Sequence, residues 1–452
     1  SRESKENGNG RDKQRDAEQD VQRTERAERG LLHEGRNRED GRSALGKYTS
    51  EASLNRWFET QRSKQGKSSG HLLYDRDRRE TDGHDSVHSG EQEGNRGRVS
   101  ERGAENRSEV KPMPDGFVDE IQKAPELFSQ IKMLIDREHK KGQFFMCGSQ
   151  QFQMMKGVSE SLSGRIGLVT LLGFSLRERY GVSNDTPFLP TDEYFDERKK
   201  QLANIPYEDV WKMIHRGSMP ELCENPDFDW QMFYGAYVRT YIERDVRDLS
   251  EIGDTVKFTR FMTAAAASTG QLVNLASMAR DVGISQPTAE RWLSILVASN
   301  IVYLLKPYSN NITKRAVKTP KLYFLDTGLA AYLTRWNTPD VLKNGAMAGA
   351  FFESFVISEI IKSYYNKGIV EPPLYFYRDK DMNEIDLVIE ENGTLYPLEM
   401  KKHADPQKKD MDAFDLLDKI PGTKRGPGGV ICLYDRLITL KGNDRVIPIN
   451  YL

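Results

Sequence analysis

The chain has 452 residues, a formal net charge of -2 and 30% charged residues, so it is long enough for several domains and has no overall field that attracts nucleic acid or acidic lipid. Its three cysteines, Cys147, Cys223 and Cys432, never form a Cys-x-x-Cys pair, which argues against a disulfide framework and a zinc site. No apolar run approaches the length of a membrane span, and the sequence therefore predicts a soluble cytoplasmic protein.

Residues 1–112 are rich in charges of both signs and poor in apolar side chains. Such a segment buries too little apolar surface to offset chain entropy, so we expect a disordered tail. Within it, residues 52–61 have helical spacing and form either a short recognition helix or a transient one. Residues 41–49 nearly match a phosphate loop, but Tyr48 stands where Ser or Thr is required and no apolar strand comes before Gly41. We interpret this match as chance.

The stretch from Gly116 to Gln122 is an apolar strand that ends in Asp119 and Glu120. A buried parallel strand of this kind delivers a magnesium-ordering Asp and a water-polarising Glu to the phosphates of a nucleotide. A strand end capped by solvated acids is the alternative. The sequence around these acids decides between the two.

A helix with an apolar face follows Pro125, a second strand covers residues 144–147, and a third apolar run covers residues 166–172. Alternating strands and helices predict a parallel sheet whose ligands lie beyond the carboxyl ends of its strands. Asp119, Glu120 and Ser149 are all expected at that edge.

Five motifs in this order resemble the prokaryotic AAA-type (AAA+) ATPases that carry a C-terminal domain of unknown function. The motifs are Val118–Leu127, Gly148–Gln150, Ser161–Arg165, Leu176–Glu178 and Tyr241–Asp245. The resemblance covers about residues 113–452 and implies ATP and Mg²⁺ as cofactors.

By this resemblance Asp119 and Glu120 correspond to the Walker B pair and Ser149 to the sensor position. Arg165 and Arg244 are the candidates for the arginine that meets the γ-phosphate, although a salt bridge to an acid beside Arg244 explains that residue equally well.

Members of the family place a strand, a phosphate loop and a further strand ahead of Walker B, and here the polar tail fills that length. The resemblance therefore implies an incomplete ATP site with impaired hydrolysis. Two explanations stay open: a frameshifted or recombined gene, and a genuine disordered extension.

Residues 185–255 predict a helical lid whose aromatic side chains form a core stripe. Residues 256–335 predict a winged helix, in which Asn274 and Ser285 cap the two helices of the helix-turn-helix. The loop that follows is basic and acid-free, and it indicates either a DNA contact or, as an alternative use of a winged helix, packing against protein. Its basic residues are Lys306, Lys314, Arg315, Lys318 and Lys321.

Residues 336–452 contain an amphipathic helix that begins near Phe351 and two strands joined by Asn392-Gly393, the preferred centre of a two-residue hairpin turn. This turn places Asp386 opposite Glu399, with Lys401 on the same face. Two carboxylates directly across a strand pair repel each other unless a cation lies between them, and Mg²⁺ prefers such oxygen ligands.

This pattern resembles the PD-(D/E)xK, restriction-endonuclease-like α/β core. The resemblance implies that Glu353 is the helix acid, Asp386 and Glu399 are metal ligands, and Lys401 is the catalytic lysine. The alternative is an inactive relic of the fold or a solvated charged edge.

The sequence as a whole predicts an α/β multidomain chain: a disordered tail (1–112), a partial AAA-type P-loop NTPase core with a parallel sheet (113–184), a helical lid (185–255), a winged helix-turn-helix (256–335) and a nuclease-like domain (336–452). The leading hypothesis is a DNA-associated ATP-binding protein. A metal-dependent nuclease and a non-enzymatic, homo-oligomeric assembly protein are the alternatives.

Overall fold

The computed structural model describes seven stretches of the chain: residues 116–139, 142–148, 157–182, 186–242, 254–309, 319–369 and 371–452. All of them lie in one of two compact units, Tyr48–Leu452. Several predictions fall outside the described residues. These are the disordered tail with its helix and its near-match to a phosphate loop, and the roles of Ser149, Arg244, Lys314, Arg315 and Lys318.

The first described element is a pair of parallel strands, β1 (Gly116–Val118) and β2 (Phe144–Met146), in which Phe117 pairs with Phe145. Between them run the 3-10 helix η3 (Ile121–Lys123) and helix α3 (Glu126–Glu138), which begins after Pro125. Residues 157–161 are also helical. The predicted strand-helix-strand order is confirmed here. The small core consists of Ile121, Phe128, Ile131, Val158 and Leu162.

The third predicted strand does not form: residues 166–172 have no regular structure. A strand needs a neighbour for its backbone hydrogen bonds, and among the described residues β1 and β2 form a separate sheet of only two strands. The apolar run stays partly open to solvent, with Val169 57% exposed. The prediction of a strand was therefore wrong, since apolar character gives a segment burial potential but does not supply its pairing partner.

The described part of the predicted helical lid (185–255), residues 186–242, is mainly helical, as predicted. Helix α5 (Leu176–Arg179) precedes this part, which contains α6 (Asp192–Arg198), η4 (Lys199–Gln201), α7 (Tyr207–Arg216), α8 (Pro220–Glu224), α9 (Trp230–Ala236) and the π-helix η5 (Tyr237–Ile242). The predicted aromatic core is confirmed for Trp211, Trp230, Phe233 and Tyr234, which are buried. Tyr207 is an exception at 41% exposure, and Tyr237 is half-buried.

Three helices and a short antiparallel sheet follow: α11 (Thr255–Ala267), β3 (Gln271–Leu272), α12 (Leu275–Val282), α13 (Gln286–Ala298), β4 (Val302–Pro307) and β5 (Lys321–Phe324). Asn274 and Ser285 accept the capping hydrogen bonds of α12 and α13, as predicted. Gly283 ends α12 in the left-handed conformation that glycine adopts without strain. The strands pair in the order β4, β5, β3.

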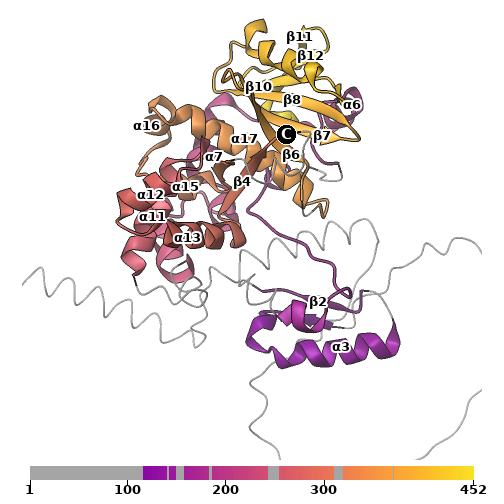
Figure 1. Cartoon of the computed structure of the whole chain (residues 1–452), viewed down its shortest axis with the longest axis vertical. Coiled ribbons are helices and arrows are strands. Elements are labelled where there is room, and N and C mark those ends of the chain that lie inside the picture. The colour runs from indigo at the N-terminus through magenta and orange to yellow at the C-terminus, as the bar shows by residue number, and fades with distance from the viewer. Residues whose placement is uncertain are drawn as a thin grey trace, which may run out of the picture. The chain divides into compact units, whose positions relative to one another are not determined.

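The strands after residue 370 extend this small sheet rather than forming a separate one. They are β6 (Leu374–Arg378), β7 (Glu384–Glu391), β8 (Thr394–Lys401), β9 (Lys424–Arg425), β10 (Gly429–Cys432), β11 (Ile438–Lys441) and β12 (Asp444–Pro448). Strand β6 pairs in parallel with β4, so the described strands join in the order β11-β12-β10-β8-β7-β6-β4-β5-β3, and β9 pairs with β8. Figure 1 shows this sheet beside helix α17.

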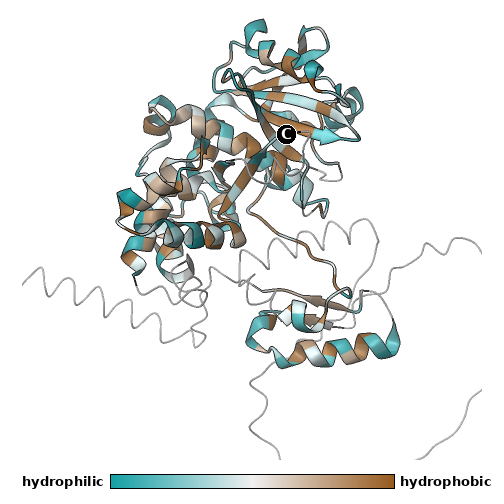
Figure 2. Cartoon of the chain, in the orientation of Figure 1, coloured by the Kyte–Doolittle hydropathy of each residue, from teal (hydrophilic) through white to brown (hydrophobic). Residues whose placement is uncertain are grey.

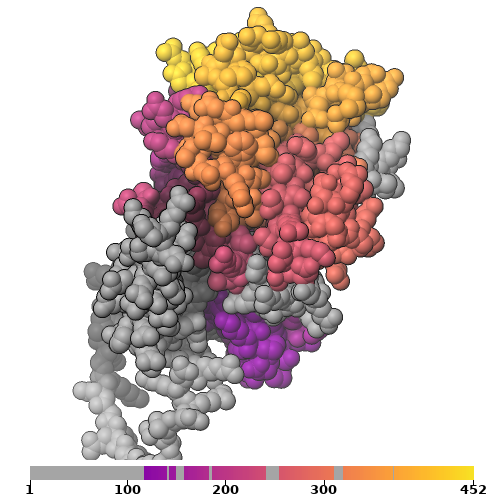
Figure 3. Space-filling model, turned by 90° about the vertical axis from the view of Figure 1, so that its left-hand side faces the viewer, coloured from indigo at the N-terminus to yellow at the C-terminus, as the bar shows by residue number. Residues whose placement is uncertain are grey.

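The remaining helical elements are α15 (Thr327–Leu333), α16 (Pro339–Asn344), α17 (Ala348–Tyr365), η6 (Lys408–Lys419) and η7 (Ile449–Tyr451). Helix α17 was predicted to be amphipathic, and this prediction was wrong. Its serines, Glu359 and Lys362 are buried along with its apolar residues, because β5 and β8 pack against it together with α7, α15 and α16. Figure 2 shows its mainly hydrophobic colouring. In the space-filling view the C-terminal residues (yellow) meet the residues before them (orange) without a gap (Figure 3).

None of the described helices has the length and hydrophobicity that crossing a membrane requires. All three cysteines are free thiols.

Candidate functional site

The β7–β8 hairpin carries the carboxylates of the C-terminal segment. Asn392 and Gly393 form its turn with positive φ angles of 50° and 76°, the backbone conformation that an Asn-Gly turn favours. The register pairs Leu387 with Leu398, as the sequence predicts. One step further along, Asp386 lies beside Glu399, and its Oδ2 accepts a hydrogen bond from the Met400 amide at 2.9 Å.

Glu399 is the most perturbed acid of the hairpin. Burial, and next the adjacent charge of Asp386, raises the pKa of Glu399 to about 8. Lys401 Nζ donates to Glu399 Oε1 at 2.7 Å, but within the described chain no donor reaches the buried Oε2 atom. The two carboxyl groups therefore share a region that holds an excess proton or a cation.

Glu353 comes to the same place from helix α17. Its Oε1 accepts hydrogen bonds from Tyr323 OH at 2.5 Å and from Lys321 Nζ at 3.2 Å. Burial, and then the charge of Asp386, raises the pKa of Glu353 to about 7. We call Glu353, Asp386, Glu399 and Lys401 the acid site. The structure brings all four of these predicted residues together.

Sequence reasoning missed the contribution of strand β5 to the acid site. Lys321 is only 4% exposed, and its Nζ lies 2.6 Å from Glu384 Oε1 as well as 3.2 Å from Glu353 Oε1. Burial alone lowers a lysine pKa, but Glu353 and Asp386 outweigh it and raise the pKa of Lys321. The proposal that Lys321 grips DNA does not fit this position, because the ammonium group is enclosed. Of the predicted basic loop, Lys306 is described and exposed.

A signal for Lys321 and Tyr323 was present in the sequence. Lys321 and Tyr323 are two positions apart on β5, so both side chains point to the same face of the strand. Tyr323 is fully buried. A lysine and a tyrosine on the buried face of a strand both need polar partners. The position of those partners on α17 and β7 depends on the tertiary fold.

Within the described chain, no group of three or more His, Cys, Asp or Glu side chains has a metal-holding arrangement. Mg²⁺, however, commonly binds proteins through one or two carboxylates and keeps several waters. Asp386 and Glu399 with its unpaired buried Oε2 fit this smaller requirement.

The two Walker B candidates lie after strand β1, at the carboxyl end of the parallel pair. Asp119 Oδ1 accepts hydrogen bonds from the Cys147 thiol at 2.6 Å and the Glu120 amide at 2.9 Å. Glu120 has a left-handed backbone with φ of 51° and accepts from Gln122 Nε2 at 2.5 Å. Both acids therefore follow β1 and lie at the carboxyl edge of the parallel pair, as predicted.

Arg165 does not reach these acids. Its guanidinium forms a two-pronged pair with Asp136 on α3, with Nε to Oδ1 at 2.7 Å and Nη2 to Oδ2 at 3.2 Å. The pair holds the pKa of Asp136 below its usual range. In this arrangement Arg165 ties the loop after residues 157–161 to α3.

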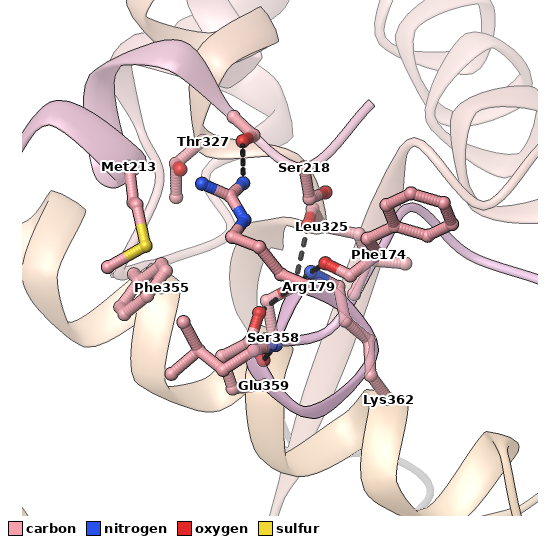
Figure 4. Close-up of a pocket in the computed structure, with 12 residues that line it drawn as sticks. Phe174, Arg179, Met213, Ser218, Leu325, Thr327, Phe355, Ser358, Glu359 and Lys362 are labelled. Atoms are coloured by element: carbon pink, nitrogen blue, oxygen red, sulfur yellow. Dashed lines mark hydrogen bonds and ion pairs between the residues drawn. The ribbon is translucent and has the colours of Figure 1, made fainter. Parts of the chain in front are cut away.

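A second polar cluster lies where residues 173–182 pass helix α17 (Figure 4). Lys362 Nζ donates to Phe174 O at 3.0 Å and to Glu359 Oε1 at 2.9 Å, while Glu359 Oε2 accepts from the Leu176 amide at 2.6 Å. Arg179 Nη2 donates to Gly217 O at 2.8 Å. The cavity among these groups measures about 10 Å³, enough for about one water. This cavity is too small for a nucleotide.

Three family models match different parts of the chain. Residues 95–180 match an AAA domain model, residues 207–340 match a domain of unknown function (DUF8612), and residues 348–452 match another domain of unknown function (DUF4143). The first match supports the AAA-type ATPase resemblance of the region around Asp119.

Two similar proteins are Uncharacterized protein Mb2031c of Mycobacterium bovis and Uncharacterized protein Rv2008c of Mycobacterium tuberculosis. Each is 29% identical over 290 residues, which is 64% of this chain. The alignment spans 59% of the length of each relative. No solved structure matches the chain.

Proposed function

We propose that the acid site cleaves phosphodiester bonds with a divalent metal ion, as a nuclease of the PD-(D/E)xK type. The observation that carries this proposal is the close approach of Asp386 and Glu399 across two paired strands, with Lys401 bonded to Glu399 at 2.7 Å. Two half-buried carboxyl groups side by side repel each other unless they share a proton or bind something positive. An AAA-type core, a winged helix and such a site in one chain favour DNA as the substrate.

Asp386 and Glu399 are the residues that would hold Mg²⁺. When bound, the ion acts as a Lewis acid on a phosphate oxygen and lowers the pKa of bound water. The Asp386 carboxylate is fixed for this task by the Met400 amide. Glu399 must lose its proton before it can bind a metal, so metal binding is expected to strengthen as the pH rises toward 8. Lys401, oriented by Glu399, supplies a positive charge beside the attacking water or the phosphate.

The test is Mg²⁺-dependent cleavage of linear DNA by the full chain. Lys401→Ala should lower the rate by about 10²–10³-fold, in the range observed when one preorganised charge-stabilising donor is removed. Lys402→Ala is the matched control, because Lys402 follows in the sequence but is exposed. Equal rates for the wild type and Lys401→Ala would point to a contaminating nuclease and reject the proposal.

A second candidate function is ATP binding at Asp119 and Glu120, with impaired hydrolysis. The match of residues 95–180 to the AAA domain model and the position of both acids after β1 favour it. The double variant Asp119→Ala, Glu120→Gln should lose ATP binding measured by calorimetry. Undetectable binding by the unmodified chain at millimolar ATP would reject this function.

The DNA contact is a further part of the proposal. Helix α13 exposes only two charged residues within its described length, Glu290 and Arg291, so the winged helix would grip phosphates rather than read bases. Lys306 at the end of β4 is the described residue positioned for this role. Lys306→Ala should weaken DNA binding equally for different sequences. The proposed compartment is the cytoplasm, where free thiols persist.

A further inference from the structure

The acid site receives two residues from a part of the chain that precedes its own segment. Glu353, Asp386, Glu399 and Lys401 all lie within residues 348–452, the segment matched by the second domain of unknown function. Lys321 and Tyr323 lie on β5, within residues 207–340, which match the first. Strand β4 pairs with both β5 and β6, so the two segments share one sheet.

The contacts of these two residues converge on one oxygen atom. Tyr323 OH and Lys321 Nζ both donate to Glu353 Oε1, at 2.5 Å and 3.2 Å. The side chain of Lys321 is 5% exposed and that of Glu353 is 16% exposed. Burial on this scale strengthens the hydrogen bond between the opposite charges, and removing one of the two partners then lowers the stability of the fold.

Lys321 is itself held from three sides. Glu353 and Glu384 accept from its ammonium, and the ring of Phe376 on β6 lies 5.7 Å away. Arg378 Nε lies 3.4 Å from the other oxygen of Glu384. The ammonium group therefore has one stable position, next to Glu353.

We propose that Lys321 and Tyr323 are positioning residues for the acid site, which hold the Glu353 carboxylate in place beside Asp386. The site is then composite, complete only when β5 and α17 belong to one folded unit. This inference deepens the proposed nuclease function and rests on it for the role in cleavage. The contact itself is testable without any activity.

The first experiment measures unfolding midpoints of the metal-free full chain. Tyr323→Phe should lower the midpoint in the wild-type background, because it removes one of two donors to a buried carboxylate. In the Glu353→Met background, where the acceptor is already gone, the same change should leave the midpoint unchanged or raise it. An equal decrease in both backgrounds would overturn the inference, since it would show that Tyr323 does not act through Glu353.

The second experiment measures Mg²⁺-dependent cleavage. Tyr323→Phe should lower the rate at saturating Mg²⁺ by about tenfold or more, because even a small displacement of the Glu353 carboxylate from its catalytic position lowers the rate strongly. The Mg²⁺ concentration for half-maximal rate should stay within about twofold, since the ligands Asp386 and Glu399 are untouched. In the Glu353→Met background, which has no acceptor for the Tyr323 hydroxyl, the additional Tyr323→Phe change should have no effect. The same loss in that background would mean a general structural role and reject the inference.

Two further variants sharpen the comparison. Tyr303 on β4 pairs directly with Tyr323, so Tyr303→Phe removes a hydroxyl from a neighbouring tyrosine and should change neither readout. Lys321→Met leaves Glu353 and Glu384 without their shared cation and should lower the midpoint more than Tyr323→Phe. If it fails to fold, Tyr323→Phe still decides the question. If the wild type cleaves nothing, the nuclease function fails, and the unfolding midpoints still decide whether β5 holds Glu353.

Discussion

Replacing Lys362 by methionine removes the cation of an ion pair that is buried on both sides. The side chains of Lys362 and Glu359 are each 3% exposed, and Nζ lies 2.9 Å from Oε1. The same ammonium donates to the Phe174 carbonyl at 3.0 Å. In the variant, Glu359 Oε1 and the Phe174 carbonyl therefore both lose the hydrogen bond from Lys362 Nζ, while Glu359 Oε2 keeps its bond to the Leu176 amide.

The expected loss of stability follows from this geometry. Removing one partner of a buried pair costs about 3–5 kcal/mol, because an uncompensated charge stays in the interior. For a cooperative unit of about 150–250 residues, in which each kcal/mol shifts the midpoint by about 2–4 °C, that corresponds to a decrease of about 6–20 °C in the unfolding midpoint. The double variant Lys362→Met, Glu359→Gln should be more stable than Lys362→Met alone, since no buried charge remains.

The assay is thermal unfolding of the full chain, followed by circular dichroism at 222 nm. Lys212→Met is a matched control, because Lys212 and Asp209 have the same spacing in a helix and a Nζ to Oδ1 distance of 2.8 Å. The control pair is exposed, at 67% and 39%, so its loss should leave the midpoint unchanged. Equal midpoints for Lys362→Met and Lys212→Met would show that burial does not decide how much an ion pair stabilises this fold.

Three further predictions concern protonation. Burial lowers the pKa of His215, so its stabilising effect is complete above about pH 6.5 and is lost as the pH falls; thermal scans from pH 7 to 5 should show a steeper fall for the wild type than for His215→Gln. The pKa of Glu399 is raised to about 8, so its contribution is lost as the pH rises through that value. In EDTA at pH 9, Glu399→Gln should therefore be more stable than the wild type by up to about 5 kcal/mol, because the pKa rises from 4.5 to about 8 and each tenfold change in proton affinity corresponds to about 1.4 kcal/mol. Added Mg²⁺ should stabilise only the wild type. Burial raises the pKa of all three thiols, that of Cys432 to about 11. The native chain should therefore react slowly with a thiol reagent at pH 8. Asp119 raises the pKa of Cys147 further, so Asp119→Asn should speed labelling at Cys147. Fast labelling of the native chain would contradict the burial of these thiols.

Features set by neighbouring residues were predictable from the sequence. Asn274 and Ser285 cap their helices because a cap is decided by a side chain and an amide three residues away. Likewise Asn392-Gly393 fixes the hairpin register, and the register brings Asp386 beside Glu399.

Features that depend on distant packing were not predictable in the same way. The serines, Glu359 and Lys362 gave α17 polar positions that suggest solvent. The chain from Phe174 to Leu176 bonds to Glu359 and Lys362 instead, and the serines bond to Thr269, Leu325 and Phe188. Lys321 sits in a basic loop by sequence and in a carboxylate cluster in space. The sequence gives the charge of a side chain, but the partner of that side chain depends on which strands lie next to each other in the fold.

The pairing of β4 with β6 also has a consequence for expressing parts of this chain. A fragment that begins at residue 348 would retain β6 but lose β4, and the Phe376 carbonyl would lose the Tyr308 amide that donates to it at 2.6 Å. An apolar strand with an open edge is a template for intermolecular pairing. We expect such a fragment to aggregate, and a fragment that begins before Phe174, and so keeps both β4 and the residues that cover α17, to remain monodisperse by light scattering.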